Sequence, residues 1–153
     1  MATKTGKKYI ICDVAVSDRG KSTFLAGIIK LMLNNPNFKV IAQNLHLVTE
    51  QWVVFEEVNT GETILIQTKG DDEESYDETR KYLLEHNVDI IVCARRTHGI
   101  TADVVQYIAK KYHFTELDFT HMYPQDFNWA LPAFVNIANP TLTQAIYNII
   151  VSL

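Results

Sequence analysis

The chain has 153 residues, 47% hydrophobic and 21% charged, which is enough to bury the core of one globular domain. Its net charge of -4 and pI near 5.7 argue against a protein that binds nucleic acid mainly through overall positive charge. No apolar stretch approaches the roughly 20 residues of a membrane span, and no signal-type apolar core follows the basic N-terminal residues. We therefore expect one cytoplasmic domain over residues 1–153, with a flexible tail at 1–7.

Strand and helix patterns alternate along the chain. Short apolar runs predict strands at 9–14, 38–42, 88–94 and 115–121. Two further runs, 52–58 and 63–68, flank a glycine-containing reversal and predict a β-hairpin. Helical spacing of apolar residues predicts helices at 21–33, 75–85 and 101–111, and Asn139 followed by Pro140 opens a last one. This order predicts a three-layer α/β/α sandwich with a mostly parallel sheet of about five or six strands that includes one antiparallel hairpin.

The two cysteines, Cys12 and Cys93, each lie inside an apolar run that predicts a strand. Free cysteine behaves as a small hydrophobic residue when it is buried, and disulfides are rare in reducing compartments. We therefore predict that both thiols are buried and belong to neither a disulfide nor a metal site.

Residues 15–22 read Ala-Val-Ser-Asp-Arg-Gly-Lys-Ser and match the Walker A pattern, with alanine where the first glycine is usual. Alanine adds one methyl group, which a negative φ tolerates. The segment lies between a predicted strand and a predicted helix, where backbone N–H groups and the helix N-terminus can converge on one anion. The alternative is an ordinary strand-to-helix turn that spells Gly-Lys-Ser by coincidence.

On these residues the chain resembles the P-loop nucleoside triphosphatases, with a tight match over 15–23 and the same strand and helix order beyond it. The resemblance implies that Gly20 is where the backbone approaches the phosphate and that Lys21 reaches the β- and γ-phosphates. Ser22 would place its hydroxyl on Mg²⁺, and Thr23 would lie near the α-phosphate. The implied nucleotide-binding residues are Ala15, Val16, Ser17, Asp18, Arg19, Gly20, Lys21, Ser22 and Thr23.

Two segments of the sequence indicate which nucleotide base the protein binds. The hairpin is followed by Gln67-Thr68-Lys69-Gly70, a layout similar to small GTPases, which carry Asp-x-x-Gly at that point. The guanine-reading Asn-Lys-x-Asp of that family is absent after the strand predicted at 115–121, where the sequence is His121-Met-Tyr-Pro124. We therefore expect ATP rather than GTP.

A carboxylate that supports Mg²⁺ is expected at the end of a strand beside the loop. The predicted strand 63–68 ends without one, but Asp71 and Asp72 follow, and Ser22 with Asp72 is the predicted metal site. The alternative is that the acidic residues at 71–74 complement the macrodipole of the next helix. Other acids compete for the role, namely Asp13 in the first strand and, more weakly, Glu56 and Glu57 in the hairpin.

Two arginines, Arg95 and Arg96, follow the strand predicted at 88–94, at the sheet edge where α/β proteins bind ligands. They could neutralise phosphate charge, or one could face solvent while the other pairs with an acid. His98 is predicted to be a surface histidine rather than a ligand. The aromatic residues of the loop 123–138 are predicted to fill a secondary core rather than cover the base.

These residues predict nucleoside triphosphate binding, with Mg²⁺-dependent hydrolysis of ATP or phosphoryl transfer as the leading function. The expected catalytic residues are Lys21, Asp71, Asp72 and Arg96. A nucleotide-dependent switch with little turnover is the alternative, because the strand-end acid is missing, and a scaffold that has lost its ligand is the third. No sequence feature indicates a membrane or nucleic-acid partner, and a homodimer or a protein partner at the loop 123–138 is left open.

Overall fold

The structure is a computed structural model that describes residues 6, 8–15, 21–44, 52–68, 76–96, 99–119, 144 and 147–150. Most of the expected N-terminal tail, residues 1–5 and 7, lies outside the described residues. Within the described part, no helix is long and apolar enough to cross a membrane. The elements in chain order are β1 (Tyr9–Ala15), α1 (Lys21–Leu33), β2 (Phe38–Asn44), β3 (Trp52–Glu57), β4 (Thr63–Gln67), α2 (Asp77–Glu85), β5 (Ile90–Arg96), α3 (Ile100–Tyr112) and β6 (Thr115–Phe119).

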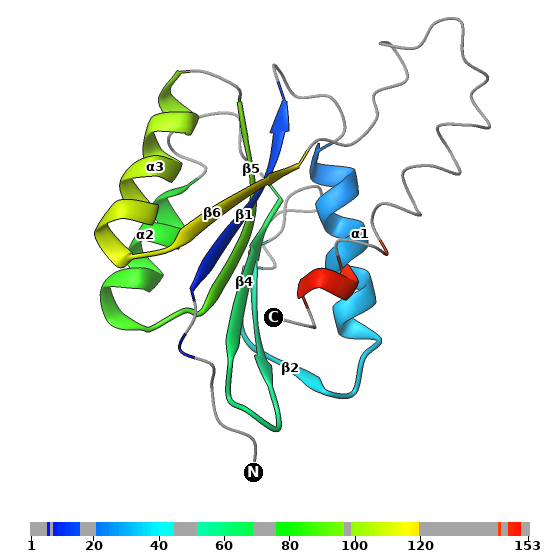
Figure 1. The fold of residues 1–153 in the computed structure, drawn as a ribbon. Coiled ribbons are helices and arrows are strands. Elements are labelled where there is room, and N and C mark those ends of the chain that lie inside the picture. The colour runs from blue at the N-terminus through cyan, green and yellow to red at the C-terminus, as the bar shows by residue number, and fades with distance from the viewer. Residues whose placement is uncertain are drawn as a thin grey trace, which may run out of the picture.

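The fold is α/β, as predicted, with a mixed six-stranded sheet in the order β2-β3-β4-β5-β1-β6 (Figure 1). The pairs β4–β5, β5–β1 and β1–β6 are parallel, whereas β3 is antiparallel to both of its neighbours, β2 and β4. Among these six strands only β3 therefore runs against the rest, and the sheet is mostly parallel. The hairpin predicted at 52–68 is the pair β3–β4, and β2 extends it into an antiparallel meander.

The hairpin turn shows why its sequence reverses the chain. Gly61 has a φ of +77°, a left-handed conformation that glycine adopts without steric cost. The Glu57 carboxylate accepts hydrogen bonds from the backbone N–H groups of Asn59 and Thr60, at 3.1 and 2.7 Å. The carboxylate of Glu57 therefore stabilises the turn.

Hydrophobic side chains cover both faces of the sheet, because strand residues alternate between two cores. On one face α1 packs Leu25, Ile28, Ile29 and Met32 against strand residues such as Ile11, Val92 and Ala94, and Ile150 joins them. On the other face α2 and α3 pack residues such as Leu83, Val105 and Ile108 against Ile10, Cys12, Leu65 and Cys93. Figure 1 shows α1 on the opposite side of the sheet from α2 and α3. Both cysteines are fully buried and free, as predicted.

The connections that leave β1 and β5 go to opposite faces of the sheet. β1 leads into α1 on one face, while its neighbour β5 leads into α3 on the other. In open α/β sheets, ligands bind in the crevice at the carboxyl ends of two such strands. Ala15 at the end of β1 and Arg96 at the end of β5 are direct partners in the ladder, and they flank this point.

Candidate functional site

The Walker A segment begins at the end of β1 and continues into α1. Ala15 is the last residue of β1, and Lys21, Ser22 and Thr23 are the first three residues of α1. The intervening residues 16–20, and the side chains of these three helical residues, lie outside what the structure describes. The described backbone is therefore a strand and a helix of 13 residues, separated by five residues in the sequence, and this strand and helix were both predicted. The N-terminus of α1 carries the positive end of the helix macrodipole at this edge.

The predicted metal-supporting acids, Asp71 and Asp72, lie outside the described residues. Of the competing acids, Asp13 is fully buried in β1, two residues before Ala15. It alternates with Ile11 and therefore lies on the face that α1 covers. Glu56 and Glu57 lie at the opposite edge of the sheet, because β3 is antiparallel and Glu56 pairs with Thr63 at the start of β4. Of these three competing acids, Asp13 is thus the one at the carboxyl edge, two residues before the Walker A segment begins.

The carboxyl end of β4 carries a neutral amide. Gln67 is buried, and its Oε1 accepts a hydrogen bond of 2.5 Å from Thr79 Oγ1 in α2. Trp52 Nε1 in turn donates to Thr79 Oγ1 at 3.2 Å. The amide is thereby held against α2, on the face of the sheet away from α1. This chain of contacts explains why glutamine suits the position, and it leaves the end of β4 without a carboxylate.

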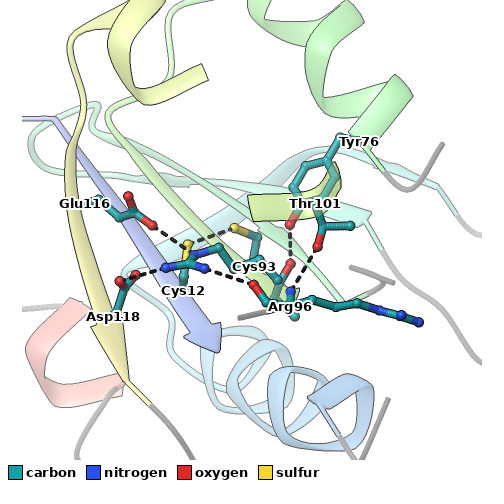
Figure 2. Close-up of polar contacts among 9 residues, drawn as sticks. Cys12, Tyr76, Cys93, Arg96, Thr101, Glu116 and Asp118 are labelled. Carbon is teal, nitrogen blue, oxygen red and sulfur yellow. Dashed lines mark hydrogen bonds and ion pairs between the residues drawn. The ribbon is translucent and has the colours of Figure 1, made fainter. Parts of the chain in front are cut away.

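Arg95 forms ion pairs within the protein. Its Nε lies 3.0 Å from Glu116 Oε1 and its Nη2 lies 3.1 Å from Asp118 Oδ2, and only 11% of its side chain is exposed. Both carboxylates belong to β6, so the guanidinium links β5 to β6 across β1, which lies between them (Figure 2). Burial opposes the charge of Arg95, but Asp118 and Glu116 outweigh it and raise its pKa. Arg95 is therefore the salt-bridged arginine of the pair.

Arg96 differs from Arg95 because its side chain is exposed. Figure 2 shows it leading away from the cluster around Arg95, and no ion pair involves it among the described residues. Its backbone, by contrast, is held on both sides. The N–H of Arg96 donates to Thr101 Oγ1 at 2.9 Å, and its carbonyl accepts from Arg95 Nη1 at 2.9 Å.

The thiols of two cysteines lie close to the carboxylates that pair with Arg95, and the sequence pattern did not predict this proximity. Cys12 and Cys93 are direct partners in the ladder, and their Sγ atoms are 3.6 Å apart. The ligand atoms of Cys12, Glu116 and Asp118 lie within 4.8 Å of one another, a spacing that could hold a metal ion. However, Arg95 forms ion pairs with both acids, and the contact with Cys93 together with burial raises the pKa of the Cys12 thiol. In the structure the two carboxylates therefore bind the guanidinium of Arg95. That the thiols belong to no metal site stays a prediction.

Two sequence candidates remain to be placed. His98 and the aromatic loop 123–138 lie outside the described residues. Comparison of the chain with protein-family models, with curated proteins and with solved structures found no match. Function must therefore be inferred from the residues at the carboxyl edge of the sheet.

Proposed function

We propose that this chain binds a nucleoside triphosphate, ATP in preference to GTP, through residues 15–23, and that it hydrolyses the nucleotide or transfers its terminal phosphoryl group. One observation carries this proposal: the Walker A segment starts at the end of β1, where the connections of β1 and β5 diverge to opposite faces. A chance Gly-Lys-Ser could lie in any turn of the chain. Here it coincides with the point at which sheets of this class bind ligands.

The residues have distinct roles under this proposal. Backbone N–H groups of the loop and of the first turn of α1 would donate hydrogen bonds to the phosphate oxygens of the nucleotide. Lys21, the first residue of α1, would contact the β- and γ-phosphate oxygens with its ammonium group. Arg96, the ladder partner of Ala15, would add a second positive charge as negative charge shifts onto these oxygens.

The oxygen donors near the loop fit the ligand preference of Mg²⁺. Ser22 lies in the first turn of α1, and the carboxylate of Asp13 is buried near the end of β1 on the side that α1 covers. Ser22 would hold the ion together with Asp72 or Asp13. Mg²⁺ would neutralise charge on the β- and γ-phosphates.

A nucleotide-dependent switch with little turnover is the second candidate, and the end of β4 favours it. Gln67 stands where a metal-supporting acid is expected, and its amide oxygen is engaged by Thr79 rather than directed to the α1 face. Binding could then change the affinity for a partner without efficient hydrolysis.

Thermal unfolding with added nucleotide tests the proposal. Mg-ATP at a hundredfold excess over its dissociation constant should stabilise the protein by about 2.7 kcal/mol. Lys21→Ala should abolish this stabilisation, whereas Lys30→Ala, at an exposed lysine in the last turn of the same helix, should retain it. Absence of stabilisation by both Mg-ATP and Mg-GTP in the wild-type protein would refute nucleotide binding.

Phosphate release then separates the enzyme from the switch. Stabilisation without release of phosphate from ATP supports the switch. If phosphate is released, Asp13→Asn, Asp71→Asn and Asp72→Asn should each be measured for binding and for turnover. The acid that supports the metal is the one whose asparagine variant still binds ATP but no longer hydrolyses it.

A further inference from the structure

Arg96 combines an exposed side chain with a backbone that the side chains of Thr101 and Arg95 hold by hydrogen bonds. Thr101 Oγ1 accepts from its N–H, and Arg95 Nη1 donates to its carbonyl. One peptide earlier, the hydroxyl of Tyr76 donates to the carbonyl of Ala94 (Figure 2). Tyr76 is fully buried and Thr101 is 1% exposed; the contact of Tyr76 with Ala94 is buried, and that of Thr101 with Arg96 is partly buried. The end of β5 is therefore fixed although the side chain of Arg96 reaches solvent.

Two of these contacts come from outside the ladder that β5 forms with β1. Thr101 belongs to the first turn of α3, and Tyr76 directly precedes α2. The N-terminal ends of α2 and α3, on the face of the sheet opposite α1, thus provide side chains that hold the last residues of β5 in place.

The register of β1 with β5 places Arg96 opposite the start of the Walker A segment. Its ladder partner is Ala15, the first residue of that segment. Arg96 alternates with Ala94, which packs in the core under α1, so both lie on the face from which the segment enters α1. The neighbouring charge of Arg95 is already neutralised by Glu116 and Asp118. Arg96 therefore contributes the positive charge of the pair that is presented at this edge.

We infer that Thr101 is a positioning residue for Arg96, and that Arg96, so held, binds the terminal phosphate of the nucleotide. This inference rests on the proposed function. In a phosphate loop the backbone N–H groups hold the α- and β-phosphates, so the γ-phosphate depends most on side chains. The planar guanidinium binds phosphate oxygens with two parallel hydrogen bonds, which requires a defined orientation of the side chain. Holding the backbone of Arg96 supplies part of that orientation.

A double-mutant cycle on Arg96 and Thr101 tests the inference. Calorimetric titration would measure the dissociation constants of Mg-ADP and of Mg²⁺ with a non-hydrolysable ATP analogue. Arg96→Gln should weaken the triphosphate about tenfold to a hundredfold, the range of a charge-assisted hydrogen bond, and change diphosphate binding less than twofold. Thr101→Val, which removes the hydroxyl, should weaken the triphosphate severalfold in the same selective way. Combined with Arg96→Gln, it should add nothing further.

Control variants exclude a general loss of structure or charge. Thr101→Ser keeps the hydroxyl and should bind both nucleotides as the wild type does. Lys110→Gln removes an exposed charge from the last turn of α3 and should leave both dissociation constants unchanged. If Thr101→Val does not fold, Tyr76→Phe replaces it in the cycle, because it removes only the hydroxyl that holds Ala94.

The outcomes separate the two proposals. Wild-type protein that binds neither nucleotide refutes the proposed function and this inference with it. Triphosphate binding that Arg96→Gln leaves unchanged overturns the inference and leaves the proposed function standing. The same holds if Thr101→Val and Arg96→Gln weaken binding additively, or if they weaken the diphosphate as much as the triphosphate.

Discussion

Polar contacts lie at both edges of the parallel part of the sheet. At the amino edge they join neighbouring strands, whereas at the carboxyl edge they hold the backbone of one exposed residue. At the amino edge, Asp89 Oδ2 accepts from the N–H and the hydroxyl of Thr63, at 2.9 and 3.3 Å. The backbone N–H of Tyr9 donates to the carbonyl of Asp89, so that β4, β5 and β1 are joined where they begin. At the carboxyl edge, contacts from Thr101 and Arg95 converge on the backbone of Arg96, whose side chain is exposed.

This difference separates residues that stabilise the fold from residues that serve a site. At the amino edge, the carboxylate of Asp89 and the hydroxyl of Thr63 are buried and satisfy one another. At the carboxyl edge, buried groups hold a charged side chain that faces outward, beside the start of the Walker A segment. We therefore expect substitutions at the amino edge to change stability alone, and substitutions at the carboxyl edge to change nucleotide binding as well.

The largest expected effect on stability is at Asp89. Asp89→Ala leaves the buried N–H of Thr63 without its acceptor, which should lower the free energy of unfolding by roughly 2–3 kcal/mol in urea denaturation. Asp89→Asn keeps an oxygen acceptor and should lower it less. Nucleotide affinity of the folded Asp89→Ala protein should equal that of the wild type. A tenfold change in affinity would show that the two edges are coupled.

Arg95 should have a smaller effect on stability but should change binding too. Arg95→Met leaves Glu116 and Asp118 facing each other without the guanidinium, which should lower the free energy of unfolding by roughly 1–3 kcal/mol at pH 7. The loss should shrink as the pH falls through the raised pKa of Glu116, because the protonated carboxyl group no longer repels Asp118. Triphosphate binding should weaken, since Arg95 also donates to the carbonyl of Arg96.

Arg80→Met is the matched control for Arg95→Met. Arg80 pairs with Asp77 at 2.7 Å on the exposed surface of α2. A surface pair of this kind contributes about 0.5 kcal/mol or less, so this variant should unfold almost as the wild type does. Equal losses in the two variants would contradict the structural role assigned to Arg95.

Local pattern was sufficient to predict the elements, but not the contacts between them. The predicted bounds of α1, 21–33, match the structure because apolar residues at helical spacing end at Asn34-Asn35-Pro36. Whether Arg95 pairs with an acid or with phosphate could not be decided, since the answer depends on β6 lying next to β1. The pairing of strands distant in sequence fixes that neighbourhood, and no local periodicity encodes it. For the same reason Cys12 and Cys93 were predicted to be buried, but not to face each other.

The smallest effect should come from Glu116, and its sign follows from its pKa. Burial and the neighbouring charge of Asp118 raise the pKa of Glu116 in the folded protein, although Arg95 opposes them. A carboxyl group with a raised pKa favours folding below its unfolded pKa, and this contribution is lost as the pH rises through the folded value. Glu116→Gln should therefore resemble the wild type near pH 4 and gain relative stability toward pH 7, by less than about 1 kcal/mol at this partly exposed site.

Asp118→Asn provides the complementary measurement on the same carboxyl group. Removing the charge of Asp118 eliminates the second cause of the shift but leaves burial, the larger one, in place. The pKa of Glu116, followed by carbon NMR of its carboxyl group, should then fall only part of the way toward its ordinary value. A pKa that does not move would mean that the charge of Asp118 does not raise the pKa of Glu116.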